Sequence, residues 1–329
     1  MASSSSEPAR RKPWWRTAIA VAVIAAVAWF FGVTLASNWE SLQAADLSLG
    51  WWAPLATIAF VLAVAVSGAL WGGVVHRLTG ARIGPQEAIR AHNRAWLLKY
   101  IPGQVGFVAS KVVWGRERGL SRLKVLLSVV YENAFLLIGS TVPTLAILLL
   151  ARGGETAVSA TVWIAVAAMV PLAVAMHPGV LSRVISVLGR RTLGRATAGA
   201  RREVPRDELL STPVALGYQL AFLAPRVING VGVVIISVAL ADAAPESWIP
   251  LAAAYALAGA IGILAVFVPS GLGVRESVFV LFAAPYLGAD MAIIVALAAR
   301  VLATFADILI AGIYLLLSAL ARRTTKEHS

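Results

Sequence analysis

The fold is decided by residues 51–75, which read WWAPLATIAFVLAVAVSGALWGGVV. None of these 25 residues carries a charge. As a helix rising about 1.5 Å per residue, the stretch is longer than the ~30 Å hydrocarbon core of a bilayer. Similar apolar runs occupy 17–37, 125–150, 157–176, 212–241, 248–268 and 289–320. Because lipid offers the backbone no hydrogen bonds, these runs predict an all-α, polytopic membrane bundle.

The composition also indicates a membrane protein. Hydrophobic residues make up 59% of the chain and charged residues only 13%, whereas a soluble domain has about 25% charged residues. The absence of cysteine excludes disulfides, thiolate nucleophiles and thiolate metal sites. A net charge of +12 could indicate nucleic-acid binding, but the positive residues lie in short stretches between apolar runs, where membrane proteins carry orientation signals. We therefore expect no nucleic-acid partner.

The chain divides into a basic N-terminal tail (1–16), expected to be disordered, a single transmembrane bundle (17–320) and a short C-terminal tail (321–329). The run at 17–37 follows a basic stretch, as in a signal peptide. It is long enough to span a bilayer, however, and has no clear A-x-A cleavage site. We expect it to be retained as the first helix.

Lys and Arg residues concentrate in alternate connections between the apolar runs. They cluster before residue 17, between 76 and 124, between 177 and 211, and after 321, whereas the opposite connections carry mainly Asp and Glu. Short loops rich in Lys and Arg stay on the cytoplasmic side. This pattern predicts a bacterial-type cytoplasmic (inner) membrane protein with both termini in the cytoplasm.

Two segments interrupt an apolar helical pattern with Pro and Gly, and they suggest a weak repeat around 85–115 and 248–287. The first is Lys99-Tyr100-Ile101-Pro102-Gly103-Gln104-Val105-Gly106, and the second is Val268-Pro269-Ser270-Gly271-Leu272-Gly273-Val274. Proline cannot continue the helix, and glycine allows a tight reversal. Paired interruptions in two halves of a chain point to a transporter binding site. The alternative is a chance likeness in a chain rich in Ala, Gly and Pro.

The topology of these segments stays open at this point. Residues 76–124 begin and end on the cytoplasmic side, so they either form a re-entrant hairpin or lie along the surface. Residues 248–288 can form an inverted hairpin from the outer face, or 248–268 and 270–287 can each cross the membrane. Within the apolar run 51–75, Gly68 and Gly72 form a G-x-x-x-G pattern that allows close helix packing.

Six ionisable residues fall within the apolar stretches, where a charge costs about 2.5–3.5 kcal/mol on insertion scales. One interpretation is structural ion pairing, such as Glu132 with Arg226 or Asp307 with Arg275. The other is a site for a lipid phosphate, since guanidinium groups bind phosphate bidentately. Together with two nearby lysines and the residues of the breaks, they give the candidate substrate-binding set: Lys99, Pro102, Gly103, Gly106, Lys111, Glu132, Arg226, Pro269, Gly271, Gly273, Arg275, Glu276, Arg300 and Asp307.

Motifs of common catalytic chemistry are not present in the sequence. There is no G-x-S-x-G, H-E-x-x-H or P-loop. The four histidines have no ligand spacing, and His76, His92 and His177 are expected at membrane boundaries in a solvated or interfacial role. We expect no metal, no cofactor and no enzymatic activity.

The two interrupted segments carry a family resemblance. Residues 98–106 and 267–276 resemble the signature segments of the flippase-like family, which includes the transmembrane region of lysylphosphatidylglycerol synthase. The likeness extends from about 17 to 320, with Ser270 standing where Gly is more usual. It implies a helical bundle with re-entrant elements that moves lipids between leaflets. Bifunctional relatives carry a separate synthase or glycosyltransferase domain, which we do not expect in this chain.

Three functional hypotheses follow. The first is a lipid flippase or transporter for an anionic, aminoacylated or polyprenyl-phosphate-linked lipid. The second is a non-catalytic membrane scaffold for a lipid- or glycan-modifying enzyme acting as a partner in trans. The third is an integral-membrane enzyme that uses Glu132 or Asp307 as acid or base, although no His, Ser or metal constellation accompanies them.

Overall fold

A computed structural model describes residues 49–101, 104–151, 209–265 and 271–327, together with Trp29 and Val33. These residues form helices joined by short connections, as the apolar runs predict. Five stretches are long and apolar enough to cross a membrane, which confirms a multi-span protein: Trp52–Thr79, Arg122–Leu148, Thr212–Ala241, Pro245–Leu264 and Ala289–Ala319. The spans predicted at 17–37 and 157–176 lie outside the described residues.

Helices α4 (Pro85–Trp96) and α5 (Val105–Glu117) are too short to cross a membrane. At about 1.5 Å per residue they measure about 18 and 20 Å, against about 30 Å of hydrocarbon. They lie on either side of the first predicted break, and together they confirm a helix–break–helix order there. The turn residues Pro102 and Gly103 lie outside the described part of the chain.

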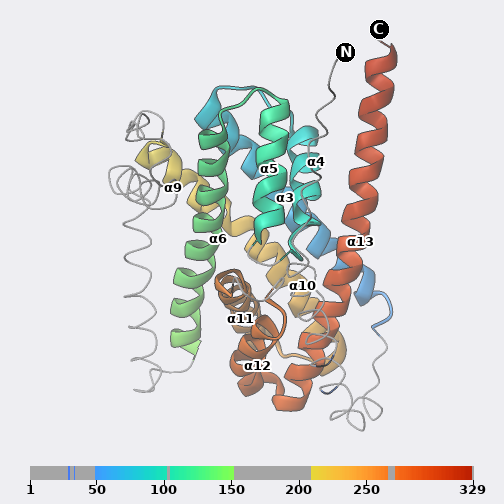
Figure 1. Cartoon of the computed structure of the whole chain (residues 1–329). Coiled ribbons are helices and arrows are strands. Elements are labelled where there is room, and N and C mark those ends of the chain that lie inside the picture. Colours follow the sequence, from blue (N-terminus) through green and yellow to red (C-terminus); the bar gives the residue numbers. More distant parts are fainter. Residues whose placement is uncertain are drawn as a thin grey trace, which may run out of the picture.

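The second break has a similar order. Helix α11 (Pro245–Leu264) precedes it and α12 (Val274–Leu287) follows it, and the two helices pack against each other. Pro269 lies in the stretch that the structure does not describe. In Figure 1, α4 and α5 occupy one half of the bundle, whereas α11 and α12 occupy the opposite half.

The longer helices α3 (Trp52–Thr79), α6 (Arg122–Ala151) and α13 (Ala289–Glu327) run past these short elements (Figure 1). The α5–α6 connection, in the basic stretch 76–124, lies at the upper end of this view, and the α12–α13 connection, beside Asp290, lies at the lower end. Basic and acidic connections therefore lie at opposite ends of the bundle.

The central core is built largely from small residues. Ala56, Ala254, Ala258, Ala292 and Ala299 are buried there around an aromatic group of Phe60, Tyr255 and Phe279. In lipid, helices gain little by hiding apolar surface, so close approach through small side chains supplies much of the packing energy. The predicted packing pair follows this rule: Gly72 faces Ala88 and Gly68 faces His92, which brings α4 against α3.

The run predicted as one helix at 212–241 is interrupted. Helix α9 (Thr212–Ala221) ends beside the fully buried Phe222, and α10 (Leu223–Ala241) begins directly after it. Pro225 has no amide hydrogen to donate to the carbonyl of Ala221, so a helical hydrogen bond is missing at this boundary. The next residue is Arg226.

Candidate functional site

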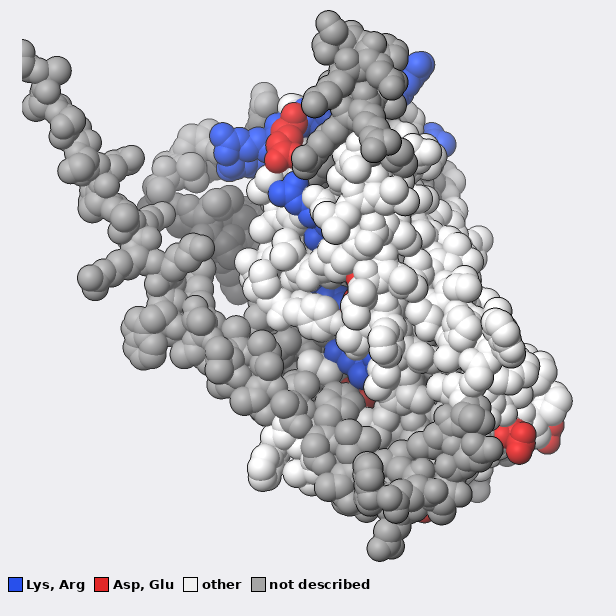
Figure 2. Space-filling model, turned by 90° about the vertical axis from the view of Figure 1, so that its right-hand side faces the viewer, with Lys and Arg blue, Asp and Glu red and all other residues white. Residues whose placement is uncertain are grey.

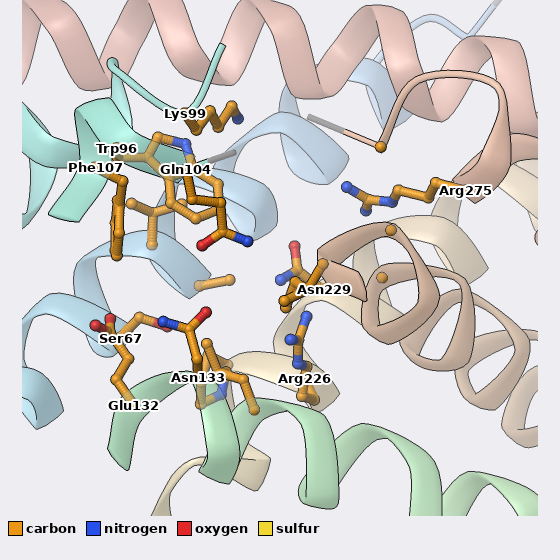
Figure 3. A pocket seen from close by; sticks show the side chains of 18 of the residues that line it. Ser67, Trp96, Lys99, Gln104, Phe107, Glu132, Asn133, Arg226, Asn229 and Arg275 are labelled. Atoms are coloured by element: carbon orange, nitrogen blue, oxygen red, sulfur yellow. The ribbon is translucent and has the colours of Figure 1, made fainter. Parts of the chain in front are cut away.

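A cavity of about 150 Å³ lies where the two broken segments meet. Ile101 and Gln104 line it beside the first break, and Ala265 and Gly271 line it beside the second. In Figure 3, Arg226 and Arg275 point toward the same open centre. The polar and aromatic side chains in its wall are Ser67, His92, Trp96, Lys99, Gln104, Phe107, Glu132, Asn133, Arg226, Asn229 and Arg275.

Two glycines of the candidate set allow the backbone to come close at these breaks. A Cβ atom on Gly106 would lie 2.7 Å from the carbonyl oxygen of Leu98, so a side chain there would push α5 away from the end of α4. A Cβ atom on Gly271 would lie 2.7 Å from the Cα atom of Gly262, and Gly271 also has a φ of +64°. Gly106 therefore allows α5 to pack against the end of α4, and Gly271 lies in the cavity wall itself.

Glu132 lies between Lys111, with which it pairs, and the ring of His92. Its Oε2 atom accepts a hydrogen bond from Lys111 Nζ at 2.5 Å, and its Oε1 atom lies 3.3 Å from His92 Nδ1. Lys111 is fully buried, with its ammonium group 4.1 Å from the ring centre of Trp71 and 4.3 Å from that of Phe107. The suggested pairing of Glu132 with Arg226 is therefore wrong, because α5 supplies the nearer cation.

Asp307 is also saturated with donors. It accepts hydrogen bonds from Trp96 Nε1 and Lys99 Nζ at 2.8 Å, and from the Tyr100 hydroxyl at 2.5 Å. This ties the end of α4 to α13. The suggested pairing of Asp307 with Arg275 is wrong, although the expectation that Asp307 has its partner on another segment is confirmed.

Glu276 and Arg300 form a weaker pair. Glu276 Oε2 accepts a hydrogen bond from the Gly273 backbone N–H at 2.7 Å and so caps the start of α12. Its other oxygen lies 3.7 Å from Arg300 Nη1. A carboxylate of the chain itself therefore already satisfies the positive end of this helix.

Arg226 differs from these residues because it forms no ion pair among the described residues. Its Nε and Nη2 atoms are buried and have no hydrogen-bond partner within the described residues. The guanidinium lies against Gly259 of α11, where a Cβ atom would come within 3.2 Å of Nη1. Burying a charge without a partner is costly. An anion in the cavity would remove that cost.

Arg275 is the second cation of the cavity wall that forms no ion pair with a carboxylate among the described residues. It stacks over the ring of Tyr255 at 4.4 Å, which holds its side chain toward the cavity. Lys99 and Glu132 also line this cavity, but Asp307 and Lys111 already neutralise them. The two arginines therefore leave a net charge of +2 on the described wall.

Several lining residues were not predicted from the sequence. His92 is buried against Glu132 and Trp96, so the expectation of a solvated histidine at a membrane boundary is wrong. Trp96 and Gln104 lay beside or within the quoted break, and their position there was the available signal. Figure 2 shows that Lys and Arg atoms lie in recesses along the middle of a largely uncharged face.

Comparison with known proteins places this site in a family. A search of curated proteins returns no match to the chain. The family described as the lysylphosphatidylglycerol synthase TM region matches residues 17–312, a range that includes both broken segments and the whole cavity wall. The chain therefore belongs to the lysylphosphatidylglycerol synthase TM region family of membrane proteins.

Proposed function

We propose that this protein moves a phosphate-bearing lipid between the two leaflets of the membrane without changing its covalent structure. The observation that carries the proposal is the pair of buried Nε and Nη2 atoms of Arg226, which lie in a cavity between membrane-spanning helices and have no hydrogen-bond partner among the described residues. A phosphate accepts hydrogen bonds from a guanidinium group in a bidentate arrangement, and such charge-assisted bonds are among the strongest in proteins. Family membership supports the same type of function.

The two breaks give this site its access. As part of the proposal, α4 and α5 form a re-entrant hairpin from the end with basic loops, and α11 and α12 approach from the opposite end. Non-helical backbone at membrane depth is tolerated where protein or a wet cavity surrounds it. The residues beside both breaks line one cavity. This arrangement gives a lipid headgroup a polar binding site between the two leaflets.

The basic end of the bundle is proposed to face the cytoplasm, because short loops rich in Lys and Arg remain there. The net +2 of the described wall favours an anionic headgroup, and the amides of Gln104, Asn133 and Asn229 can bind its hydroxyl or carbonyl groups. Phosphatidylglycerol meets both requirements. Its aminoacylated derivatives and polyprenyl phosphates share the phosphate, and lysyl-phosphatidylglycerol is tested in parallel.

The test uses purified protein in vesicles that contain phosphatidylglycerol with unmodified chains. External periodate oxidises the glycerol diol of the outer leaflet only, so continued oxidation reports translocation. We expect the wild type to expose the inner-leaflet lipid and Arg226→Gln to slow the transfer about 10- to 100-fold, as expected for losing charged hydrogen bonds. Arg94→Gln is the matched control, because this arginine is exposed on α4 and lies outside the cavity wall.

Two outcomes would count against transport. If Arg226→Gln transfers lipid as fast as the wild type, the cavity arginine has no role in translocation. If the wild type itself transfers none but co-purifies with a stoichiometric lipid- or glycan-modifying enzyme, the scaffold function replaces the transporter. Vesicles with lysyl-phosphatidylglycerol then distinguish a wrong substrate from a wrong function; its esterified glycerol has no diol for periodate, so an impermeant amine reagent reports the lysyl group instead.

A further inference from the structure

A second cavity, here called the apolar groove, adjoins the first. It has a volume of about 640 Å³ and lies between α6, α10 and α11. This volume is within the ~300–1,000 Å³ typical of small-molecule sites. Its wall is almost entirely aliphatic and aromatic and includes Pro143, Ile147, Val227, Val231, Ile235, Val238, Trp248, Ile249, Ala252 and Ala256.

Arg226 belongs to the walls of both cavities. On one side of it lie Asn133, Asn229 and Arg275, and on the other side lie the aliphatic residues of the groove. A ligand that fills both spaces needs an anionic group at the junction, polar groups on one side and a hydrocarbon on the other. A phospholipid with its phosphate on Arg226 has this order of groups.

We propose that the apolar groove holds one hydrocarbon chain of the lipid whose phosphate binds Arg226. This inference rests on the proposed function and adds the path of the chain. Val227, Val231 and Ile249 are exposed on spanning helices, so the groove opens toward the surrounding lipid and a chain can enter from the side. Because bilayer tails are as apolar as the groove, the groove contributes shape and direction rather than hydrophobic affinity.

The groove also gives the bound lipid an orientation. Its wall follows α10 from Arg226 to Val238, a rise of about 18 Å, which is comparable to half of the ~30 Å hydrocarbon core. It ends near Trp248, beside the acidic connection that contains Asp242. The acyl chain in the groove therefore points away from the end of the bundle that carries the basic connections. The tails of lipids in the leaflet at that end point in the same direction. The lipid is accordingly loaded from the leaflet at the basic end.

The first experiment maps the chain directly. Purified wild-type protein is mixed with phosphatidylglycerol that carries a diazirine at the end of one acyl chain, and the cross-linked peptides are identified after irradiation. The proposal requires adducts on the groove walls of α10 and α11, toward Val238 and Trp248. Adducts spread evenly over exposed α13 residues such as Leu309 and Leu316 would overturn it.

The second experiment fills the groove. Val231→Trp places an indole where the acyl chain is proposed to lie, and we expect transfer to fall about tenfold, because the indole and the acyl chain cannot occupy the same space. Leu220→Trp is the matched control, since Leu220 is exposed on α9 and lies outside the groove wall. Size-exclusion chromatography and unfolding temperature check that both variants fold.

The outcomes separate this inference from the proposed function. If Arg226→Gln stops transfer while Val231→Trp transfers normally, the chain does not use the groove, but the phosphate site stands. If Arg226→Gln transfers normally, the proposed function fails. Should the diazirine adducts of that variant remain in the groove, the groove would still be a chain-binding surface, but one that does not depend on Arg226.

Discussion

The buried charges of this protein fall into two regions that differ in how they are satisfied. Near α4 and α5, Glu132 is paired with Lys111, and Asp307 accepts three hydrogen bonds from side chains at the end of α4. Near α10 and α12, Arg226 and Arg275 face the cavity without a carboxylate among the described residues. The closed region attaches helices too short to span the bilayer to helices that do span it. The open region keeps its charge available for a ligand.

The largest loss of stability is expected when the ion pair of Lys111 with Glu132 is removed. Lys111→Met leaves the buried Glu132 carboxylate with only the His92 ring beside it, and removing one partner of a buried pair costs about 3–5 kcal/mol. The free energy of unfolding, measured by denaturant titration in a neutral detergent, should fall by that amount. Adding Glu132→Leu to the same chain removes the remaining charge and should recover most of the loss. Equal stability of Lys111→Met and wild type would show that this pair does not hold α5.

A smaller loss is expected at the second closed cluster. Asp307→Asn removes the charge that Lys99 Nζ meets at 2.8 Å, but Lys99 is 18% exposed and can recruit water. We expect the free energy of unfolding to fall by about 1–3 kcal/mol, the typical cost of leaving a buried donor without its hydrogen-bond partner. Glu246→Gln, at an exposed position, serves as the control. A loss no larger than that of the control would mean that the tie between α4 and α13 carries little energy.

The smallest effect on stability is expected in the open region. Arg226→Met replaces a guanidinium that has no ion-pair partner among the described residues by an apolar side chain, so the unfolding free energy should stay within about 0.5 kcal/mol of wild type or rise. Lipid transfer should fall in the same variant. Residues of functional sites are commonly less favourable for stability than an alternative would be, because activity requires them. A clear loss of stability would place Arg226 among the structural charges instead.

Hydropathy predicted the helical class and the described spans because lipid leaves the backbone few alternatives. The two breaks were also predicted from the sequence, because proline and glycine interrupt a helix at their own position. The interruption at Phe222 was not predicted, because the run at 212–241 is apolar throughout except for isolated polar residues. Pro225 was the local signal for it.

The partners of the buried charges could not be read from the sequence. Helical periodicity states which residues share a face, but it does not state which helix that face meets. Thus Arg226 and Arg275 were equally reasonable partners for Glu132 and Asp307, and the structure assigns Lys111 and Lys99 instead. The burial of His92 was not predicted for the same reason. It follows from the packing of α4 on α3, where Gly68 faces His92, and the sequence does not show which helices pack together.

The missing hydrogen bond between Pro225 and Ala221 has a mechanical consequence. A continuous helix resists bending because each turn would have to stretch or break a backbone hydrogen bond. At the α9–α10 boundary one of those bonds does not exist, so this is the most compliant point of the span Thr212–Ala241. Since Arg226 follows directly, a small change in tilt between the two pieces translates into a displacement of its guanidinium, at little elastic cost to the rest of the helix.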